Sequence, residues 1–266
     1  MKLYPLLTGW MNLKRKYLIH DEKAMNNPDL METIPIPAYL IEHPDYGYIL
    51  FDTGCNPKAM TEWEHFRTTD TPVINKENKF IIERLQDIGV NPDDVHTFVM
   101  SHLHLDHAGG LYLFNKIEKV YVNQNEIDTD ILDYKNKLPL NFHEASDIAH
   151  WEKTTIPWFK VPSETKEIKI ADGVTIINFG SGHAWGMLGL LINLPNSGNF
   201  LLVSDCCYLK ENMGPPITLP EIVYDREGYT NTMNYIVQLK EKYNAKVIFG
   251  HDINQFKESQ RNLYWD

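Results

Sequence analysis

The sequence predicts an α/β protein with two sheets and helices on their outer faces. Short strand-like runs come in hairpins, and segments with helical spacing of apolar residues separate them, which is typical of sheets flanked by helices. The 266 residues can bury a sizeable core. We expect a single domain over residues 1–266, because no Gly/Ser-rich linker, low-complexity segment or long-period repeat divides the chain.

The expected strands are short runs that end in turn signals. Asp172-Gly173 lies between two alternating runs in "EIKIADGVTIINFGSGH" and predicts a two-residue hairpin. A second hairpin is expected in "LGLLINLPNSGNFLLVSD", around residues 196–198. Single strands are expected in "YGYILFDTG", "VHTFVMSH", "KVYV" and "AKVIFGH".

Helices are expected between these strands. Apolar residues at helical spacing mark residues 78–88 and 230–243, and residues 123–137 are expected to be helical as well. Thr61 and Glu64 fit a capping box, which predicts a helix start at Thr61.

The charge of the chain argues against a polyanionic partner. The formal net charge is −11, and no Lys/Arg run is longer than Lys14–Lys16. Phosphate binding needs clustered positive charge, so we expect no nucleic acid and no anionic membrane surface as a partner.

Cysteine usage and hydropathy predict a cytoplasmic protein. The three cysteines, two of them adjacent, do not form a disulfide framework, which suits a reducing compartment. The first twenty residues lack the apolar run of a signal peptide. No stretch approaches the roughly 20 apolar residues of a membrane span.

The stretch "SHLHLDHAGG" (101–110) concentrates metal-ligand side chains. In an extended chain, residues two positions apart point to the same side, so His102, His104 and Asp106 would all point to one side. His107 points elsewhere unless the glycines that follow let the chain turn. We therefore expect two neighbouring ion sites, with His102 and His104 in the first and Asp106 and His107 in the second.

Each of these sites lacks ligands, because zinc usually takes about four. Three polar residues that follow expected strands are the best distant candidates: His183 in "SGHAWG", Asp205 in "LLVSDCCY" and His251 in "FGHD". Asp205 has two carboxylate oxygens and can span both ions. Seven nitrogen and oxygen ligands then form a dinuclear site of the kind that leaves room for a nucleophile between the metals.

Other interpretations apply to single residues. Asp205 taken alone is better interpreted as a helix N-cap or a turn carboxylate. Cys206 and Cys207 are interpreted as packing residues rather than ligands. The remaining histidines are interpreted as surface residues or residues with satisfied hydrogen bonds: His20, His43, His65, His96, His143 and His150.

The motif "HLHLDH" (102–107), followed in order by His183, Asp205 and His251, resembles the metallo-β-lactamase superfamily, as does "ILFDTG" (49–54) upstream. The segments "LFDTGCNP", "SHLHLDHAGG", "DCCYLKEN" and "GHDINQ" are similar to those of the N-acyl-homoserine lactonases, the quorum-quenching branch. The resemblance covers roughly residues 35–255.

The resemblance implies an αβ/βα sandwich of two mixed sheets flanked by helices, with two Zn²⁺ per chain at the sheet edges. It implies that a zinc-bound hydroxide opens the lactone ring of an N-acyl-homoserine lactone. Tyr208 would donate a hydrogen bond to the developing oxyanion. Asp106 would serve as ligand and proton shuttle, and Asp52 would orient a ligand histidine. The oligomeric state stays open, a homodimer included.

Two departures and three rival functions accompany this hypothesis. Met187 stands where the superfamily often has a second histidine, and Leu105 stands where the lactonases often have Phe. The nearest rival is a hydrolase of the same fold acting on another lactone, a thioester, a β-lactam or a phosphoester. A di-iron oxygen reductase usually needs Glu at His104. A metal-stabilised binding module predicts bound metal without turnover.

Overall fold

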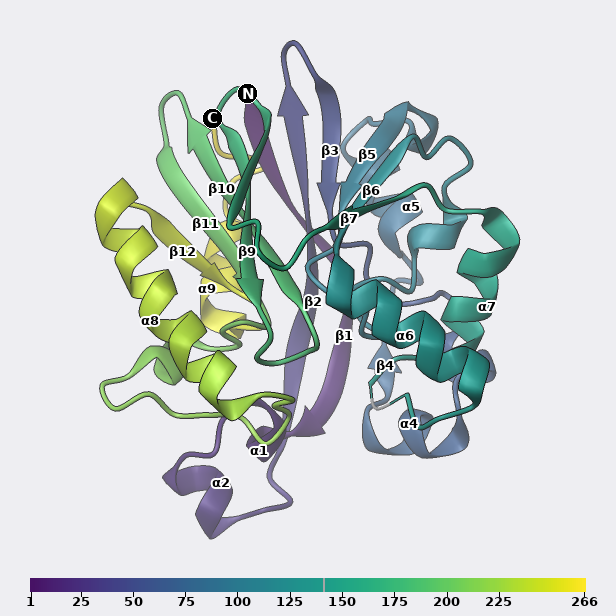
Figure 1. The fold of residues 1–266 in the computed structure, drawn as a ribbon, viewed down its shortest axis with the longest axis vertical. Helices are drawn as coiled ribbons and strands as arrows, with labels where there is room; N and C mark the ends of the chain where they lie inside the picture. The colour runs from purple at the N-terminus through teal and green to yellow at the C-terminus, as the bar shows by residue number, and fades with distance from the viewer. Residues whose placement is uncertain (141) are drawn as a thin grey trace.

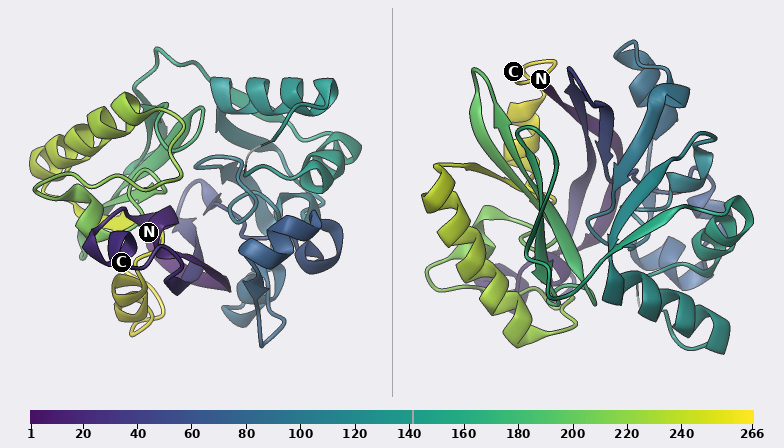
Figure 2. Two further views of the ribbon diagram at one scale, coloured as in Figure 1. Left: turned by 90° about the horizontal axis from the view of Figure 1, so that it is seen from below. Right: turned by 45° about the horizontal axis from the view of Figure 1, so that its top comes forward.

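The computed structural model describes residues 1–140 and 142–266. Within them, two β-sheets stack face to face and carry helices on their outer faces, as Figure 1 shows. This confirms the fold that the sequence predicts. The two chain termini lie side by side at one end of the sheets, where Leu3 and Trp265 exchange backbone hydrogen bonds (Figures 1 and 2).

The larger sheet is mixed. Its neighbouring strands, in spatial order, are β4 (Val73–Ile74), β1 (Lys2–Lys14), β2 (Met31–His43), β3 (Gly47–Phe51), β5 (Val95–Val99), β6 (Lys119–Asn123) and β7 (Trp158–Val161). The strands from β4 to β3 pair antiparallel, whereas β3, β5, β6 and β7 run parallel to one another. The carboxyl ends of the parallel strands therefore meet at one edge of the sheet.

The smaller sheet contains both expected hairpins. Its order is β12 (Lys246–Phe249), β11 (Gly198–Ser204), β10 (Met187–Leu194), β9 (Val174–Gly180) and β8 (Glu167–Ala171). The β8–β9 and β10–β11 pairs are antiparallel hairpins, and β12 runs parallel to β11. Asp172-Gly173 forms the first turn, with Gly173 at a φ of +73° that a residue without a Cβ adopts easily.

The core lies in three layers. Between the sheets, Ile41 and Ile49 of the larger sheet pack with Leu188 and Leu190 of the smaller one, and all four side chains are fully buried. Helices α5 (Ile81–Asp87), α6 (Gln124–Asn136) and α7 (Ala145–Thr154) cover the outer face of the larger sheet. Helix α8 (Arg226–Tyr243) covers the smaller sheet on the opposite side of the molecule (Figure 2).

Shorter helices connect these layers. They are α1 (Arg15–Leu18), α2 (Glu22–Asn26), α3 (Ala59–Glu62), α4 (His65–Asp70) and α9 (Ile253–Ser259), together with three 3₁₀ turns at Pro92–Asp94, Leu111–Leu113 and Lys210–Met213. Among the residues that the structure describes, no helix has both the length and the apolar character needed to cross a bilayer.

Three expectations about elements need correction. Thr61 does not begin a helix: it lies inside α3, and its hydroxyl donates to the Lys58 carbonyl at 2.9 Å. Helix α8 begins four residues before the expected 230, because the Asp225 carboxylate caps it by accepting from the Gly228 N–H. No pattern predicts β1 and β2, the longest strands. Prolines such as Pro35 and Pro37 interrupt their alternation.

Candidate metal centre

The seven expected ligands come from the ends of four strands. His102 follows β5 in the larger sheet, whereas His183 follows β9, Asp205 follows β11 and His251 follows β12 in the smaller sheet. All seven side chains are buried, the most exposed being Asp106 at 8%. The stacking of the two sheets places these strand ends opposite one another, so the site lies between the sheets.

The segment from His102 to His107 is a tight turn rather than an extended chain. The His104 carbonyl accepts hydrogen bonds from the His107 N–H at 3.0 Å and from the Ala108 N–H at 3.1 Å. The extended conformation expected for this segment is therefore wrong, and its division into two ion sites stays a prediction. The turn allows His107 to face the site.

Gly109 and Gly110 are needed for close packing. A Cβ at Gly109 would lie 2.4 Å from the Asn56 nitrogen, and one at Gly110 would lie 2.5 Å from the Thr53 carbonyl oxygen. Backbone atoms cannot move away cheaply, so these positions require glycine. The two residues seat the ligand turn against the 53–56 segment, which is a different role from the chain reversal that the sequence suggested.

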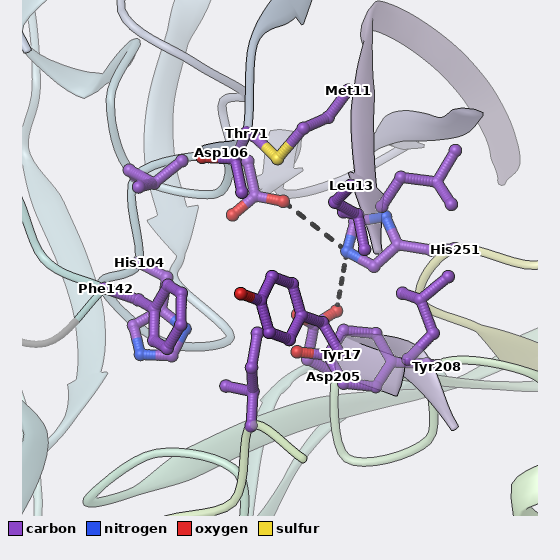
Figure 3. A pocket seen from close by; sticks show the side chains of 14 residues that line it. Met11, Leu13, Tyr17, Thr71, His104, Asp106, Phe142, Asp205, Tyr208 and His251 are labelled. Atoms are coloured by element: carbon purple, nitrogen blue, oxygen red, sulfur yellow. Dashed lines mark ion pairs between the residues drawn. The ribbon is translucent and has the colours of Figure 1, made fainter. Parts of the chain in front are cut away.

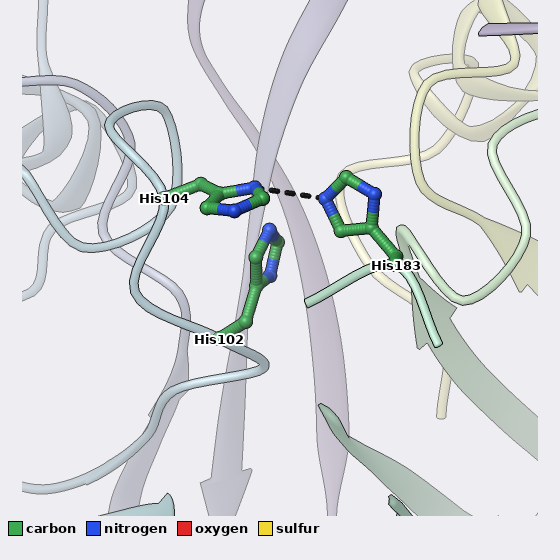
Figure 4. Close-up of side chains that lie close together, drawn as sticks. All are labelled: His102, His104 and His183. Carbon is green, nitrogen blue, oxygen red and sulfur yellow. Dashed lines mark hydrogen bonds between the residues drawn. The ribbon is translucent and has the colours of Figure 1, made fainter. Parts of the chain in front are cut away.

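The ligand atoms gather into overlapping groups. One group is His102, His104 and His183, whose rings converge in Figure 4, with His104 Nδ1 and His183 Nε2 2.8 Å apart. A second group joins Asp106, His107 and His251, and a third joins His102, His107 and Asp205. In each group the ligand atoms lie within 4.8 Å of one another.

Asp205 occupies the middle of the cluster. Its Oδ2 lies 3.4 Å from His107 Nε2 and 3.5 Å from His183 Nε2, and its Oδ1 lies 3.0 Å from His251 Nε2. Figure 3 shows His251 between Asp205 and Asp106, with Asp106 Oδ2 at 3.5 Å. One carboxylate thus lies within reach of histidines from both the His102–His104–His183 group and the Asp106–His107–His251 group.

Asp52 orients two of the histidines, His107 directly and His102 through Ser101, by contacts at their Nδ1 atoms. It follows β3 in the left-handed region, at a φ of +61°, a conformation that aspartate tolerates better than most residues. Its carboxylate accepts from His107 Nδ1 at 2.9 Å and from both the N–H and the hydroxyl of Ser101. Ser101 Oγ in turn lies 2.9 Å from His102 Nδ1. A proton held on His107 Nδ1 leaves its Nε2 free for a metal.

Backbone carbonyls orient two other ligands in the same way. His251 Nδ1 lies 2.8 Å from the Pro35 carbonyl oxygen, and His183 Nδ1 lies 3.2 Å from the Ile222 carbonyl oxygen. If each Nδ1 donates, the Nε2 atom that faces the cluster carries the lone pair.

The charges of the site divide it into a neutral and an ionised part. Burial, reinforced by neighbouring imidazoles, holds the pKa of His102 and His104 well below the ordinary value, so both rings are neutral at pH 7. Burial opposes ionisation of His107 and Asp205 too. The carboxylates around His107 nevertheless raise its pKa, and His251 and His107 lower that of Asp205.

The donor set fits metal ions. Among the described residues, His102 Nε2 and His107 Nε2 are buried without any hydrogen-bond partner, although both face the cluster. Buried polar atoms without partners are costly, and a metal ion would satisfy them. Burial raises the pKa of Cys206 and Cys207 well above the ordinary value, which keeps both as thiols. Among the described residues, none of the groups that could hold an ion contains a cysteine, so the donor atoms of these groups are nitrogen and oxygen.

Two cavities open beside the cluster. The narrower one, shown in Figure 3, has apolar walls from the N-terminal segment and reaches Asp106, Asp205, Tyr208 and His251. The wider one, of about 290 Å³, is lined by Trp185, Tyr224 and His183 among others. His104, Phe142 and Ile222 line both. Leu105 lines the narrow cavity.

Tyr208 lies where a bound substrate could meet it. Its ring stacks on His251 with the centroids 5.5 Å apart, and its hydroxyl lies 3.1 Å from His183 Nδ1. Burial raises the pKa of Tyr208 well above 10, so the hydroxyl keeps its proton and can donate.

Two residues beside the site had no signal in the sequence. Glu126 follows β6 in the first turn of α6, where a carboxylate ordinarily marks a helix start. His143 was interpreted as a surface residue or one with satisfied hydrogen bonds. It is buried and hydrogen-bonded to Glu126 at 2.9 Å, and its ring centroid also lies 4.7 Å from that of His104.

The sequence matches known proteins along nearly its whole length. The family model described as the metallo-beta-lactamase superfamily matches residues 32–191. The N-acyl homoserine lactonase AiiB of Agrobacterium fabrum is 38% identical over 264 residues, which cover 96% of this chain and 95% of that protein.

Solved structures share the fold. A crystal structure of a mutant of AiiA from Bacillus thuringiensis, with N-decanoyl-L-homoserine bound at its active site, is 26% identical and superposes with a TM-score of 0.80. The superposition covers 97% of this chain and 95% of the AiiA chain. AidC, a dizinc quorum-quenching lactonase, is 15% identical with a TM-score of 0.66, over 94% and 87% of the two chains. That last likeness concerns the fold alone.

Proposed function

Because this chain belongs to the metallo-beta-lactamase superfamily and to its N-acyl homoserine lactonases, we propose that it hydrolyses the lactone ring of N-acyl-homoserine lactones. The observation that carries the proposal is the convergence of seven buried ligand residues with the Tyr208 hydroxyl, beside a cavity with apolar walls. The substrate has a matching division into a polar ring and an apolar acyl chain.

We propose that the cluster holds two Zn²⁺ ions. His102, His104 and His183 would hold one, Asp106, His107 and His251 would hold the other, and Asp205 would contact both. Nitrogen and oxygen ligands suit zinc. When bound, such ions supply Lewis acidity, which activates water near neutral pH and polarises a carbonyl group.

Residues of the chain supply the hydrogen bond, the proton transfer and the acyl-chain contacts that the reaction needs. Tyr208 donates a hydrogen bond to the oxyanion that forms when water adds to the lactone carbonyl carbon. The bond between that carbon and the ring oxygen then breaks, and Asp106 takes up a proton from the added water and delivers it to the departing oxygen. The apolar walls of the narrow cavity, which include Met11 and Leu13, exclude water and bind the acyl chain. The product is N-acyl-homoserine with a free carboxylate.

A substrate panel tests this function. The zinc-loaded protein is given N-butanoyl-, N-hexanoyl- and N-decanoyl-homoserine lactone, and a pH-stat measures the proton released at each ring opening. A β-lactam, a thioester, a phosphoester and γ-butyrolactone are run beside them. We expect turnover of the acyl-homoserine lactones, and a lower kcat/KM for γ-butyrolactone, which lacks the acyl chain.

The controls separate the rival functions. Asp205→Ala removes the shared ligand and is expected to lose metal and turnover together. If the protein turns over the thioester, the β-lactam or the phosphoester but none of the acyl-homoserine lactones, its function is that of another hydrolase of this fold.

We also propose that the enzyme works in the cytoplasm. The support is its cysteines: Cys55, Cys206 and Cys207 are all buried and unpaired, which suits a reducing compartment.

A further inference from the structure

Glu126 is a fully buried carboxylate beside the metal cluster. It lies in the first turn of α6, with an exposed fraction of 0%. Its Oε1 accepts from the Leu103 N–H at 3.0 Å and from His143 Nε2 at 2.9 Å, and its Oε2 accepts from the Gly186 N–H at 3.1 Å. Burying a carboxylate costs free energy unless hydrogen bonds compensate for the lost water. The three donors around Glu126 supply that compensation, so the fold holds this carboxylate in a specific place.

The two backbone donors belong to the two loops that carry His102, His104 and His183, and the first of these loops also carries Asp106 and His107. Leu103 lies between His102 and His104, and Gly186 lies three residues after His183. Glu126 therefore connects a loop of the larger sheet to a loop of the smaller sheet, beside the group of His102, His104 and His183. Figure 4 shows the three rings converging from these loops.

His143 adds a second connection to the same ion position. Its ring stacks on Trp185, with the planes 3° apart and the centroids at 4.6 Å, and it meets the His104 ring edge-on at 4.7 Å. The bond to Glu126 holds the His143 ring in this place. Glu126 thus supports His104 through a side chain as well as through the backbone.

The other ion position has a different support. His107 is held by Asp52 at 2.9 Å and His251 by the Pro35 carbonyl at 2.8 Å. Within the described residues, the hydrogen bonds of Glu126 end at Leu103, His143 and Gly186. The two halves of the cluster therefore rest on separate carboxylates, although Asp52 also reaches His102 through Ser101.

We infer that Glu126 is a positioning residue that sets the metal affinity of the His102–His104–His183 position and leaves the Asp106–His107–His251 position nearly unchanged. The inference rests on the proposed function, which requires two ions in this cluster. Outer partners of metal ligands typically change metal affinity by a factor of about 10 to 100.

Glu126→Gln is the discriminating variant. The glutamine has nearly the same shape but only one acceptor oxygen. If that oxygen keeps Leu103 and His143, the amide NH₂ faces the Gly186 N–H, donor against donor. The loop that carries His183 then loses its anchor.

The experiment measures two dissociation constants per chain by Zn²⁺ titration in competition with chromophoric chelators. Wild type is compared with Glu126→Gln and with Asp128→Asn, a control two residues along the same helix whose exposed carboxylate pairs with Lys160 at the surface. For Glu126→Gln we expect one ion to weaken by about 10- to 100-fold and the other by less than about threefold. Asp128→Asn should leave both constants unchanged.

Each outcome decides the inference. Equal weakening of both ions, or of neither, would overturn it, even if the metal-free variant unfolds at a lower temperature. If Glu126→Gln does not fold, His143→Leu removes one donor while the carboxylate stays, and the same unequal weakening is expected. Wild-type protein that binds no zinc would instead refute the proposed function.

Discussion

Asp205 contacts more of the expected ligands than a single hydrogen bond would explain. It lies within 3.5 Å of nitrogen atoms on three histidines: His183 from one ligand group, and His107 and His251 from another. It immediately follows Ser204, which adopts a left-handed φ of +48° at the end of β11. This conformation is uncommon for serine and ends the strand abruptly, so that the next carboxylate turns into the cluster.

The Tyr208 hydroxyl is the best place to test the oxyanion role. Tyr208→Phe removes one oxygen and keeps the ring that stacks on His251. We expect zinc content to stay the same and kcat to fall by about 10²- to 10³-fold, because a single oxyanion donor contributes that much. Metal analysis and steady-state kinetics with N-hexanoyl-homoserine lactone provide the measurement.

Tyr229→Phe is the matched control for that variant. Tyr229 is fully buried under the smaller sheet, and its hydroxyl is without a hydrogen-bond partner among the described residues. Its loss should leave kcat unchanged. A Tyr208→Phe enzyme with wild-type kcat/KM would contradict the oxyanion role, and one that loses zinc would show that the hydroxyl serves His183 instead.

Helix α6 does more than cover the larger sheet. One of its faces is apolar and packs through Ile127, while the same buried side carries Glu126 and Asp130. Neither oxygen of Asp130 has a hydrogen-bond partner within the described residues. Its nearest cation is His143, with Nδ1 4.0 Å from Asp130 Oδ1. A helix that only covered a sheet would not need these carboxylates.

This helix makes stability depend on pH. Burial raises the pKa of Asp130 from 3.8 to about 7, against the attraction of His143. A group whose pKa is raised by folding stabilises the fold below its unfolded pKa, and that contribution is lost as pH rises through the folded pKa. The contribution of Asp130 to the free energy of unfolding should therefore fall between about pH 4 and pH 7.

Asp130→Asn tests this dependence. Urea unfolding of the metal-free protein at pH 5 and pH 8 gives the difference in free energy of unfolding between variant and wild type. We expect that difference to shift in favour of the variant by a few kcal/mol from pH 5 to pH 8, at about 1.4 kcal/mol per pKa unit. Asp128→Asn should show no such shift. An equal difference at both pH values would argue against a neutral Asp130.

The metal centre joins the two halves of the molecule. The turn from His102 to His107 belongs to the larger sheet, and His183, Asp205 and His251 belong to the smaller one. Bound ions would therefore bridge the sandwich at one end. The apolar residues between the sheets hold the halves together along the rest of their length.

Removal of metal should lower stability without unfolding the strands. Ligands that bind only the folded state stabilise it by about 2.7 kcal/mol at a concentration one hundred times Kd. About 1 kcal/mol corresponds to roughly 2 to 4 °C in Tm for a chain of this size. We expect chelation to lower Tm by at least about 5 °C and to leave the far-ultraviolet circular dichroism unchanged. Zn²⁺ should restore Tm, and an unaltered Tm would contradict the bridge.

Local patterns in the sequence were enough for the fold class and both hairpins, and they predicted the ligand set. Alternating runs around Asp172-Gly173 and the concentration of ligand side chains from His102 to His107 are features of neighbouring residues, and neighbouring residues shape turns and strand ends directly. The resemblance to lactonases added the zinc chemistry and the role of Tyr208, which remains a prediction.

Other features depend on contacts between segments far apart in the chain. The Cβ of Gly109 would meet the Asn56 backbone, and Glu126 accepts from the backbone of Leu103 and Gly186. Backbone atoms are the same in every residue, so the sequence does not show which distant segment such a contact reaches. The two cavities, the central place of Asp205 and the contacts of Glu126 exist only because the two sheets stack with these loops facing each other.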